Sequence, residues 1–140
     1  MPLTTTAIVD ANILFAAADR RDRNHSAALR ILSRGDLHAV IPALVVAEVT
    51  YLIGTRLGPG PEARFLAGLQ PFDVQAPEPD DWPRIAELVR QYRDFPLGGT
   101  DASVIALAER LRAETIITLD HLHFGTVHPR HCDRFRLLPE

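Results

Sequence analysis

The chain has 140 residues, of which 46% are hydrophobic and 24% charged; these values are typical of one globular domain, which we expect to span residues 1–140. A formal net charge of −3 argues against a protein that coats nucleic acid by bulk charge attraction. No segment approaches the roughly 20 apolar residues of a membrane span, and the first ten residues, MPLTTTAIVD, lack the basic start of a signal peptide.

The first half of the chain alternates between predicted strands and helices. Short apolar runs with β-branched residues predict buried strands, whereas longer segments with apolar residues on one face predict helices. In chain order, the expected elements are a strand at 6–9, a helical segment that ends at the charged loop 19–23, a helix from the candidate N-cap Asn24 to Gly35, a strand at 38–41, an apolar helix at 43–57 that Gly58 and Pro59 terminate, and a short helix at 62–69.

The second half continues the alternation. Its expected elements are a strand at 72–76, a helix from Asp80 or Asp81 to about residue 92, a loop at 95–99, a helix from the candidate N-cap Thr100 to Leu111, and strands at 115–119 and 135–138. This order implies an α/β domain with three layers, α/β/α, in which helices cover both faces of a mainly parallel, five-stranded sheet. In open parallel sheets, functional sites gather at the carboxyl ends of the strands.

Two aspartates directly follow predicted strands. Asp10 comes after the run Ala7-Ile8-Val9, and Asp120 comes after residues 116–119. If the two strands are parallel neighbours, both carboxylates lie at the same edge of the sheet. For Asp10 taken alone, the alternative is an ordinary turn residue at the end of a strand.

Glu48 lies inside the apolar run of residues 43–53, which has almost no polar face. An ionised carboxylate is costly to bury unless a cation or a metal ion pairs with it. The alternatives are that an arginine pairs with Glu48, or that Glu48 marks a narrow solvent-exposed face of the helix. With three other acids in the pattern, we favour a metal partner and expect apolar surroundings for this side chain.

Asp101 falls in the first turn after Thr100, where a carboxylate can also compensate the helix dipole. Carboxylates gathered at one place repel each other, so some stay protonated without a cation. Their hard oxygen atoms suit Mg²⁺ or Mn²⁺. One or two such ions could activate a water molecule and stabilise the leaving oxygen of a phosphodiester, so the four acids together predict metal-dependent hydrolysis of nucleic acid.

Four short segments carry a family pattern. They are Ile8-Val9-Asp10-Ala11-Asn12, Glu48 in its apolar helix, Gly99-Thr100-Asp101-Ala102-Ser103, and Thr118-Leu119-Asp120 through Phe124. In this order and at these separations, the segments resemble PIN-domain ribonucleases, and specifically the VapC toxins of bacterial toxin–antitoxin pairs. The resemblance covers essentially the whole chain.

The resemblance implies a PIN-like fold, a homodimer and cleavage of RNA that depends on Mg²⁺ or Mn²⁺. The implied catalytic and metal-binding acids are Asp10, Glu48, Asp101 and Asp120. By position, Asn12 and Thr118 are supporting residues that orient the acids or bound water, and Phe124 packs beneath the last acid. The resemblance further implies a cognate VapB-type antitoxin, whose C-terminal segment wraps the toxin and often places an arginine at the acids.

Two other functions fit part of the pattern. An aspartate-based phosphotransfer domain would use an acid after its first strand, but related phosphatases carry a second aspartate where this chain has Asn12. Such domains also use a basic residue, commonly lysine, and all 15 basic residues here are arginine. The second alternative is a non-catalytic module that binds RNA or an antitoxin, against which the intact set of four acids argues.

The histidines and the single cysteine are less informative. Residues 128–132 (HPRHC) lack the paired spacing of a zinc motif, so we expect a polar loop. His121 and His123 flank Asp120 in the sequence and are candidates for substrate contact. Because Cys132 is alone, no intramolecular disulfide can form, and we expect a cytoplasmic location.

Three arginines follow the first acid, at positions 20, 21 and 23. Arginine is well suited to phosphate contacts, so these side chains could line the rim of an RNA-binding site. The equally weighted alternative is a solvated charged loop, because Asp19 and Asp22 lie in the same segment.

Overall fold

The computed structural model describes residues 3–140. Its elements in chain order are β1 (Thr5–Val9), α1 (Ala11–Ala18), α2 (His25–Leu32), β2 (Leu37–Pro42), α3 (Ala43–Arg56), α4 (Pro59–Ala67), β3 (Asp73–Gln75), α5 (Asp81–Gln91), α6 (Gly99–Leu111), β4 (Thr115–Ile117), α7 (His121–Thr126) and β5 (Arg136–Leu138). The alternation of strands and helices that the sequence predicts is therefore present.

The five strands form one parallel sheet in the order β3-β2-β1-β4-β5. The chain builds outward from β1 through β2 to β3, then returns to the other side of β1 to add β4 and β5. The winding direction therefore reverses between β1 and β4. At the carboxyl ends of these two strands, Val9 pairs with Ile117. In open α/β sheets, ligands bind outside the carboxyl ends of the strands at such a reversal.

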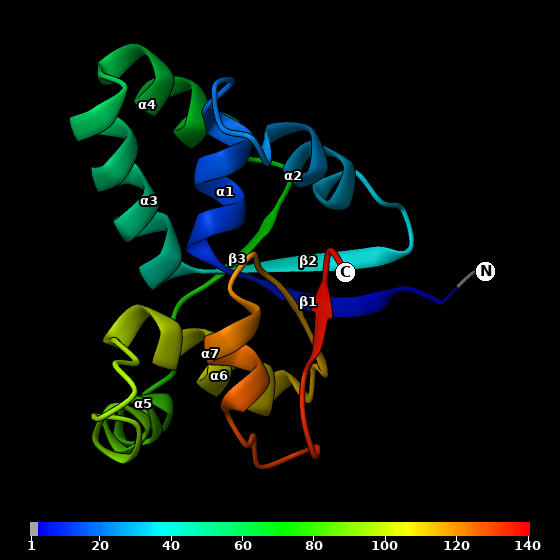
Figure 1. Ribbon diagram of the computed structural model, residues 1–140, viewed down its shortest axis with the longest axis vertical. Coiled ribbons are helices and arrows are strands. Elements are labelled where there is room, and N and C mark those ends of the chain that lie inside the picture. Colours follow the sequence, from blue (N-terminus) through cyan, green and yellow to red (C-terminus); the bar gives the residue numbers. More distant parts are fainter. Residues whose placement is uncertain (1–2) are drawn as a thin grey trace.

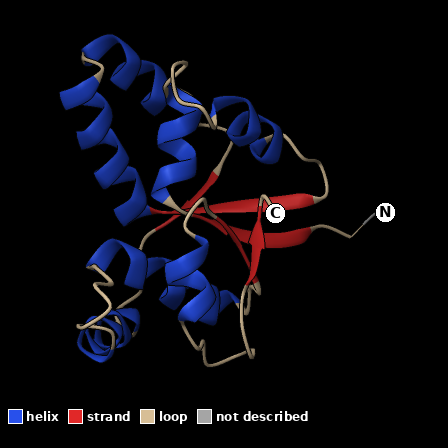
Figure 2. Ribbon diagram, viewed as in Figure 1, coloured by secondary structure: helices blue, strands red, loops and turns tan. Residues whose placement is uncertain are grey.

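Helices cover both faces of this sheet, which confirms the predicted α/β class. Figure 1 shows α1, α2, α3 and α4 on one face and α5, α6 and α7 on the other. Figure 2 shows the strands as a central layer between the two groups of helices. Parallel strands need such crossover connections, and each crossover leaves a helix packed on the sheet.

The core forms where β1 is covered from both sides. Ala7, Ile8 and Val9 are fully buried, as expected for a central parallel strand that lacks a polar face. On one face α6 packs against β1 and β2, and its central residues 102–108 are buried. Within residues 3–140, no helix is long and apolar enough to cross a membrane.

Several predicted boundaries are wrong. Thr100 is not the N-cap of α6, because the Gly98 carbonyl already accepts the Ala102 N–H at 2.9 Å and Gly98 takes the cap position. Asn24 is at the N-cap of α2, but its side chain makes no capping hydrogen bond. Pro59 starts α4 rather than only ending the previous helix, which suits the fixed φ of proline at a first helical position.

The end of β4 also differs from the prediction. The strand stops at Ile117 instead of residue 119, and the helix α7, which the sequence analysis did not anticipate, starts at His121. Asp120 is the N-cap of this helix and accepts the His123 N–H at 3.0 Å. Phe124 in α7 is fully buried, in agreement with the packing role expected for it.

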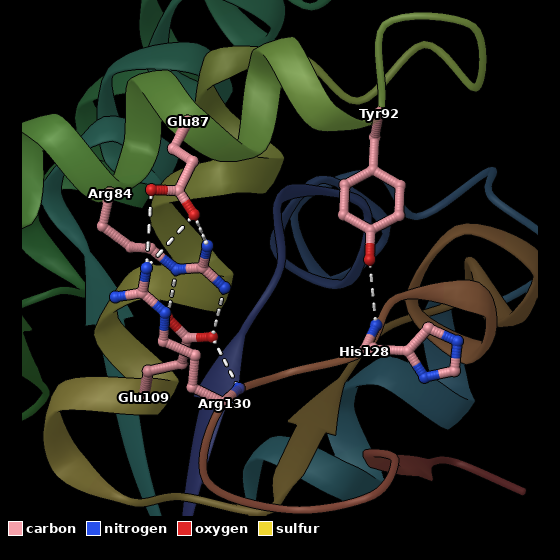
Figure 3. Close-up of polar contacts among 6 residues, drawn as sticks. All are labelled: Arg84, Glu87, Tyr92, Glu109, His128 and Arg130. Carbon is pink, nitrogen blue, oxygen red and sulfur yellow. Dashed lines mark hydrogen bonds and ion pairs between the residues drawn. The ribbon is translucent and has the colours of Figure 1, made fainter.

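The loop between α7 and β5 is tied to α5 and α6 by an ionic network (Figure 3). Arg84 makes two hydrogen bonds to Glu109, at 2.7 and 2.8 Å, and a third to Glu87 at 2.7 Å. Arg130 from the loop joins both acids, through its backbone N–H to Glu109 at 2.9 Å and its guanidinium to Glu87 at 3.1 Å. The bidentate Arg84–Glu109 pair, which has a strong directional preference, joins α5 to α6. The two contacts of Arg130 hold the loop against both helices.

Candidate active site

Asp10 and Asp120 flank the point where the sheet reverses its winding direction. Asp10 follows β1 directly, is the N-cap of α1 and is only 4% exposed. Its backbone N–H donates to the Ile117 carbonyl of β4 at 2.9 Å, so the two strand ends are held together. Asp120 lies three residues beyond β4 and is half-buried. The expected convergence of these two acids at one sheet edge is present.

Thr118 connects the two acids. Its hydroxyl, which is fully buried, donates to Asp10 Oδ2 at 2.9 Å and accepts the Asp120 backbone N–H at the same distance. Asn12 supports this arrangement, since its Oδ1 accepts the Leu119 N–H at 3.0 Å and its Nδ2 donates to the Thr118 hydroxyl at 3.3 Å. The side chains of Asn12 and Thr118 therefore fix the segment that carries Asp120 relative to β1.

Asp101 approaches the same edge from α6. Because α6 packs on β1 and β2 and leads into β4, its N-terminal turn lies at the carboxyl ends of the strands. Burial raises the pKa of Asp101 above its usual range, and the negative charges of Glu48 and Asp120 raise it further. Such charge effects require proximity, so they link Asp101 to two of the other predicted acids.

Glu48 reaches the site from α3, but the prediction of apolar surroundings for it is wrong. Glu48 is exposed, because α3 buries only one narrow stripe, formed by Val45, Val49 and Ile53. The spacing of four residues puts these three on one face, and Glu48 lies off it. Glu48 therefore marks a solvent-exposed face, yet its charge still acts on Asp101 at the rim of the site.

Asp10 shows the strongest electrostatic effect of the four acids. Burial is the largest cause, and the charges of Asp101 and Asp120 add to it, so that the pKa of Asp10 rises from 3.8 to about 7. Hydrogen bonds from the Ala11 N–H and the Thr118 hydroxyl act in the opposite direction and do not cancel the rise. A buried carboxyl beside like charges holds its proton unless a cation offsets them.

No arginine offsets the charge of these acids. Among residues 3–140, none of the four carboxylates forms an ion pair with an arginine, although the chain has 15 of them. Within the same range, no three His, Cys, Asp or Glu side chains converge closely enough to form a ready-made metal cluster. The donors are nevertheless all hard carboxylate oxygens, which fit Mg²⁺ or Mn²⁺ better than Zn²⁺.

His123 is a polar neighbour that the sequence analysis gave only as a candidate for substrate contact. Its Nδ1 lies 2.7 Å from Asp120 Oδ2, and its ring packs on Phe95 from the loop before α6. A histidine three residues after a helix-capping aspartate is the signal that could have identified this contact.

Comparison with known proteins agrees with this geometry. Residues 7–124 match the model of the family described as PIN domain. The chain is also 31% identical, over 134 residues, to the Ribonuclease VapC26 of Mycobacterium tuberculosis, with 94% of this chain and 99% of that protein covered. The chain is a PIN-domain protein of the VapC type. The segment that matches the family contains all four acids of the candidate site.

Solved structures share the fold of this PIN domain. The crystal structure of M. tuberculosis VapC20, described as a Sarcin-Ricin loop cleaving toxin, superposes with a TM-score of 0.77 at 16% identity, covering 83% of this chain and 91% of that one. A toxin–antitoxin complex from Klebsiella pneumoniae gives a TM-score of 0.66 at 24% identity, covering 86% and 92% of the respective chains. At these identities the likeness shows the fold alone.

The arginines after α1 lie away from the acids of this PIN domain. Arg20 and Arg21 line a groove of about 1070 Å³ together with Arg56 and Arg64. They follow the C-terminal end of α1, whereas Asp10 caps its N-terminal end, about 12 Å away for a helix of eight residues. Arg23 is exposed in the same loop and does not line this groove. These arginines therefore follow the end of α1 that is opposite to Asp10.

Proposed function

We propose that this chain, as a single PIN domain, is a divalent-metal-dependent endoribonuclease and the toxin of a toxin–antitoxin pair. Asp10, Glu48, Asp101 and Asp120 are its proposed catalytic and metal-binding acids, with Mg²⁺ or Mn²⁺ as the cofactor. The observation that carries the proposal is the group of neighbouring carboxylates without an arginine partner among the described residues, set at the carboxyl ends of β1 and β4.

The chemistry follows from what these residues can hold. A bound divalent cation would supply a water of lowered pKa and neutralise charge on the phosphate oxygens. Asp10, held by Thr118 at the buried end of the site, and Asp101 in the first turn of α6 would bind and orient it. Glu48 and Asp120 would complete the set of acids around the cation and accept hydrogen bonds from the attacking water.

RNA is the proposed substrate because the relative that is 31% identical is named a ribonuclease. An antitoxin of the VapB type is the proposed partner, since several solved structures with this fold are toxin–antitoxin complexes. A homodimer is also proposed. The exposed Tyr51 of α3 and Trp82 of α5, which are 70% and 50% exposed, offer apolar area for such contacts.

The proposal is tested by an RNA cleavage assay with added Mg²⁺, Mn²⁺ or EDTA. The wild-type protein is compared with Asp10→Ala and with Asp101→Asn, which keeps the shape of the side chain and removes its charge. We expect cleavage that requires the metal and is lost in both variants. Cleavage that survives EDTA and both substitutions would contradict the proposal, and RNA binding without any cleavage would favour a non-catalytic module.

A further inference from the structure

His123 holds both carboxylate oxygens of Asp120. The backbone N–H of His123 donates to Oδ1 at 3.0 Å, and the ring Nδ1 lies 2.7 Å from Oδ2. The second contact is at ion-pair distance. One residue therefore fixes the position and the rotation of the Asp120 side chain.

The ring of His123 is itself held in place by Phe95. The two ring centroids are 4.5 Å apart, with an angle of 42° between the planes. Phe95 comes from the loop at residues 92–98, between α5 and α6, whereas His123 belongs to α7. Aromatic packing of this kind restricts the rotation of the imidazole, and the short Nδ1–Oδ2 contact restricts it further.

The His123 ring also lies within electrostatic reach of Asp101. Burial and the charges of Glu48 and Asp120 raise the pKa of Asp101, and His123 acts in the opposite direction. His123 thus stands beside two of the proposed metal-binding acids. Its side chain remains 27% exposed, so it is not simply a core residue.

We propose that His123 is a positioning residue that pre-orients the Asp120 carboxylate for a divalent cation. An ionised carboxylate has about four lone-pair positions. One of them accepts the hydrogen bond from the His123 N–H, and the ring contacts the other oxygen, which leaves lone-pair positions on the carboxylate for the metal. Hydrogen-bonding partners of metal ligands typically contribute about 10- to 100-fold to metal affinity. This inference rests on the proposed function, because it assumes that the four acids bind a cation.

Isothermal titration of the purified protein with Mn²⁺, without RNA, tests the inference. His123→Phe keeps an aromatic ring for Phe95 and the backbone N–H, but it removes the Nδ1 donor. His123→Asn loses the ring and keeps an amide nitrogen near the Nδ1 position. The matched control is His121→Phe, because His121 is in the same helix, is exposed and makes no contact with the Asp120 side chain.

We expect His123→Phe to weaken Mn²⁺ binding at least about tenfold, His123→Asn to stay within about threefold of the wild type, and His121→Phe to bind like the wild type. Thermal unfolding in EDTA verifies that each variant folds. If His123→Phe does not fold, His123→Gln replaces it, because its amide is one methylene farther from the backbone and cannot take the Nδ1 position.

The outcomes separate the two proposals. Equal Mn²⁺ affinity in the wild type and His123→Phe would overturn the role of His123 and leave the metal site intact. Equal loss in His123→Phe and His123→Asn would also overturn it, because the donor would then not be what matters. No Mn²⁺ binding by the wild type would instead overturn the proposed function on which the inference rests.

Discussion

Two groups of acidic residues in this chain differ in whether arginine pairs with their carboxylates. Glu109 and Glu87, between α5, α6 and the loop before β5, are paired with Arg84 and Arg130 in a continuous network. Asp10 and the acids near it, at the carboxyl edge of the sheet, have no arginine partner among the described residues. The difference is that only the first group is paired with arginine.

The pKa values of the two groups show the consequence. Burial acts to raise the pKa of Glu109, but hydrogen bonds from Arg84 and Arg130 overcome it and hold the pKa below its usual range. Burial also raises the pKa of Asp10, and there the neighbouring charges add to the effect and bring it to about 7. Acids that stabilise a fold are usually paired, so the absence of an arginine partner in this group supports the proposed cation site.

Substitution of an unpaired acid gives the largest expected effect. Asp101→Asn should lower metal-dependent RNA cleavage by about 100-fold or more, because it removes a charged metal ligand without changing the side-chain shape. The steady-state cleavage rate of a labelled RNA measures this. Glu109→Gln is the matched control and should cleave at a rate near that of the wild type. An equal loss of cleavage rate in Asp101→Asn and Glu109→Gln would contradict the proposed difference between the arginine-paired acids and the acids at the sheet edge.

Substitution of a paired acid should change stability instead. Glu109→Gln leaves Arg84, whose side chain is only 11% exposed, without its carboxylate partner, and should lower the free energy of unfolding by about 3 kcal/mol. Urea denaturation monitored by circular dichroism measures the change. An unchanged midpoint would mean that the network in Figure 3 does not hold the loop against α5 and α6.

The raised pKa of Asp10 predicts how metal binding depends on pH. Below pH 7 the carboxyl is protonated and must lose its proton to bind a cation, so Mn²⁺ affinity should rise about tenfold per pH unit up to about pH 7 and then level off. Calorimetric titrations between pH 5 and pH 8 measure the slope. A Mn²⁺ affinity that does not change between pH 5 and pH 8 would contradict the raised pKa of Asp10.

The raised pKa of Asp10 also predicts that the metal-free protein becomes less stable as the pH rises. The folded-state pKa of Asp10 lies above its ordinary value of 3.8. The stabilisation of the fold by the protonated carboxyl is therefore complete below about pH 4 and is lost as the pH rises to about 7. Asp10→Asn removes the ionised form, and at pH 7.5 in EDTA it should raise the free energy of unfolding by about 1 kcal/mol. Thermal unfolding measures this smallest effect, and a destabilised variant would count against it.

The sequence predicts the sheet and part of the site for clear physical reasons. The apolar run before Asp10 predicts a buried strand, and the end of that strand fixes where the carboxylate lies. The charge of Glu48 acts on Asp101, but the prediction of apolar surroundings for Glu48 is wrong, because composition alone does not tell which stripe of α3 is buried. The short helix α7 was missed because six residues carry too little periodicity.

Contacts between distant segments could not be predicted. Thr118 and Asp10 are 108 residues apart, and no sequence pattern links Phe95, in the loop before α6, to His123 in α7. The ionic network is likewise assembled from three elements, with Arg130 separated from Glu87 by 43 residues. Such pairings depend on how the helices pack, and a single sequence does not specify them in advance.

The central claim is that the unpaired acids form a site for a divalent cation. Titration of the metal-free protein with Mn²⁺ at pH 7.5, monitored by calorimetry, tests it most directly. We predict saturable binding by the wild type and by Glu109→Gln, and its loss in Asp101→Asn. If the wild type does not bind Mn²⁺, or if Asp101→Asn binds it equally well, the acids at the sheet edge are not the metal site.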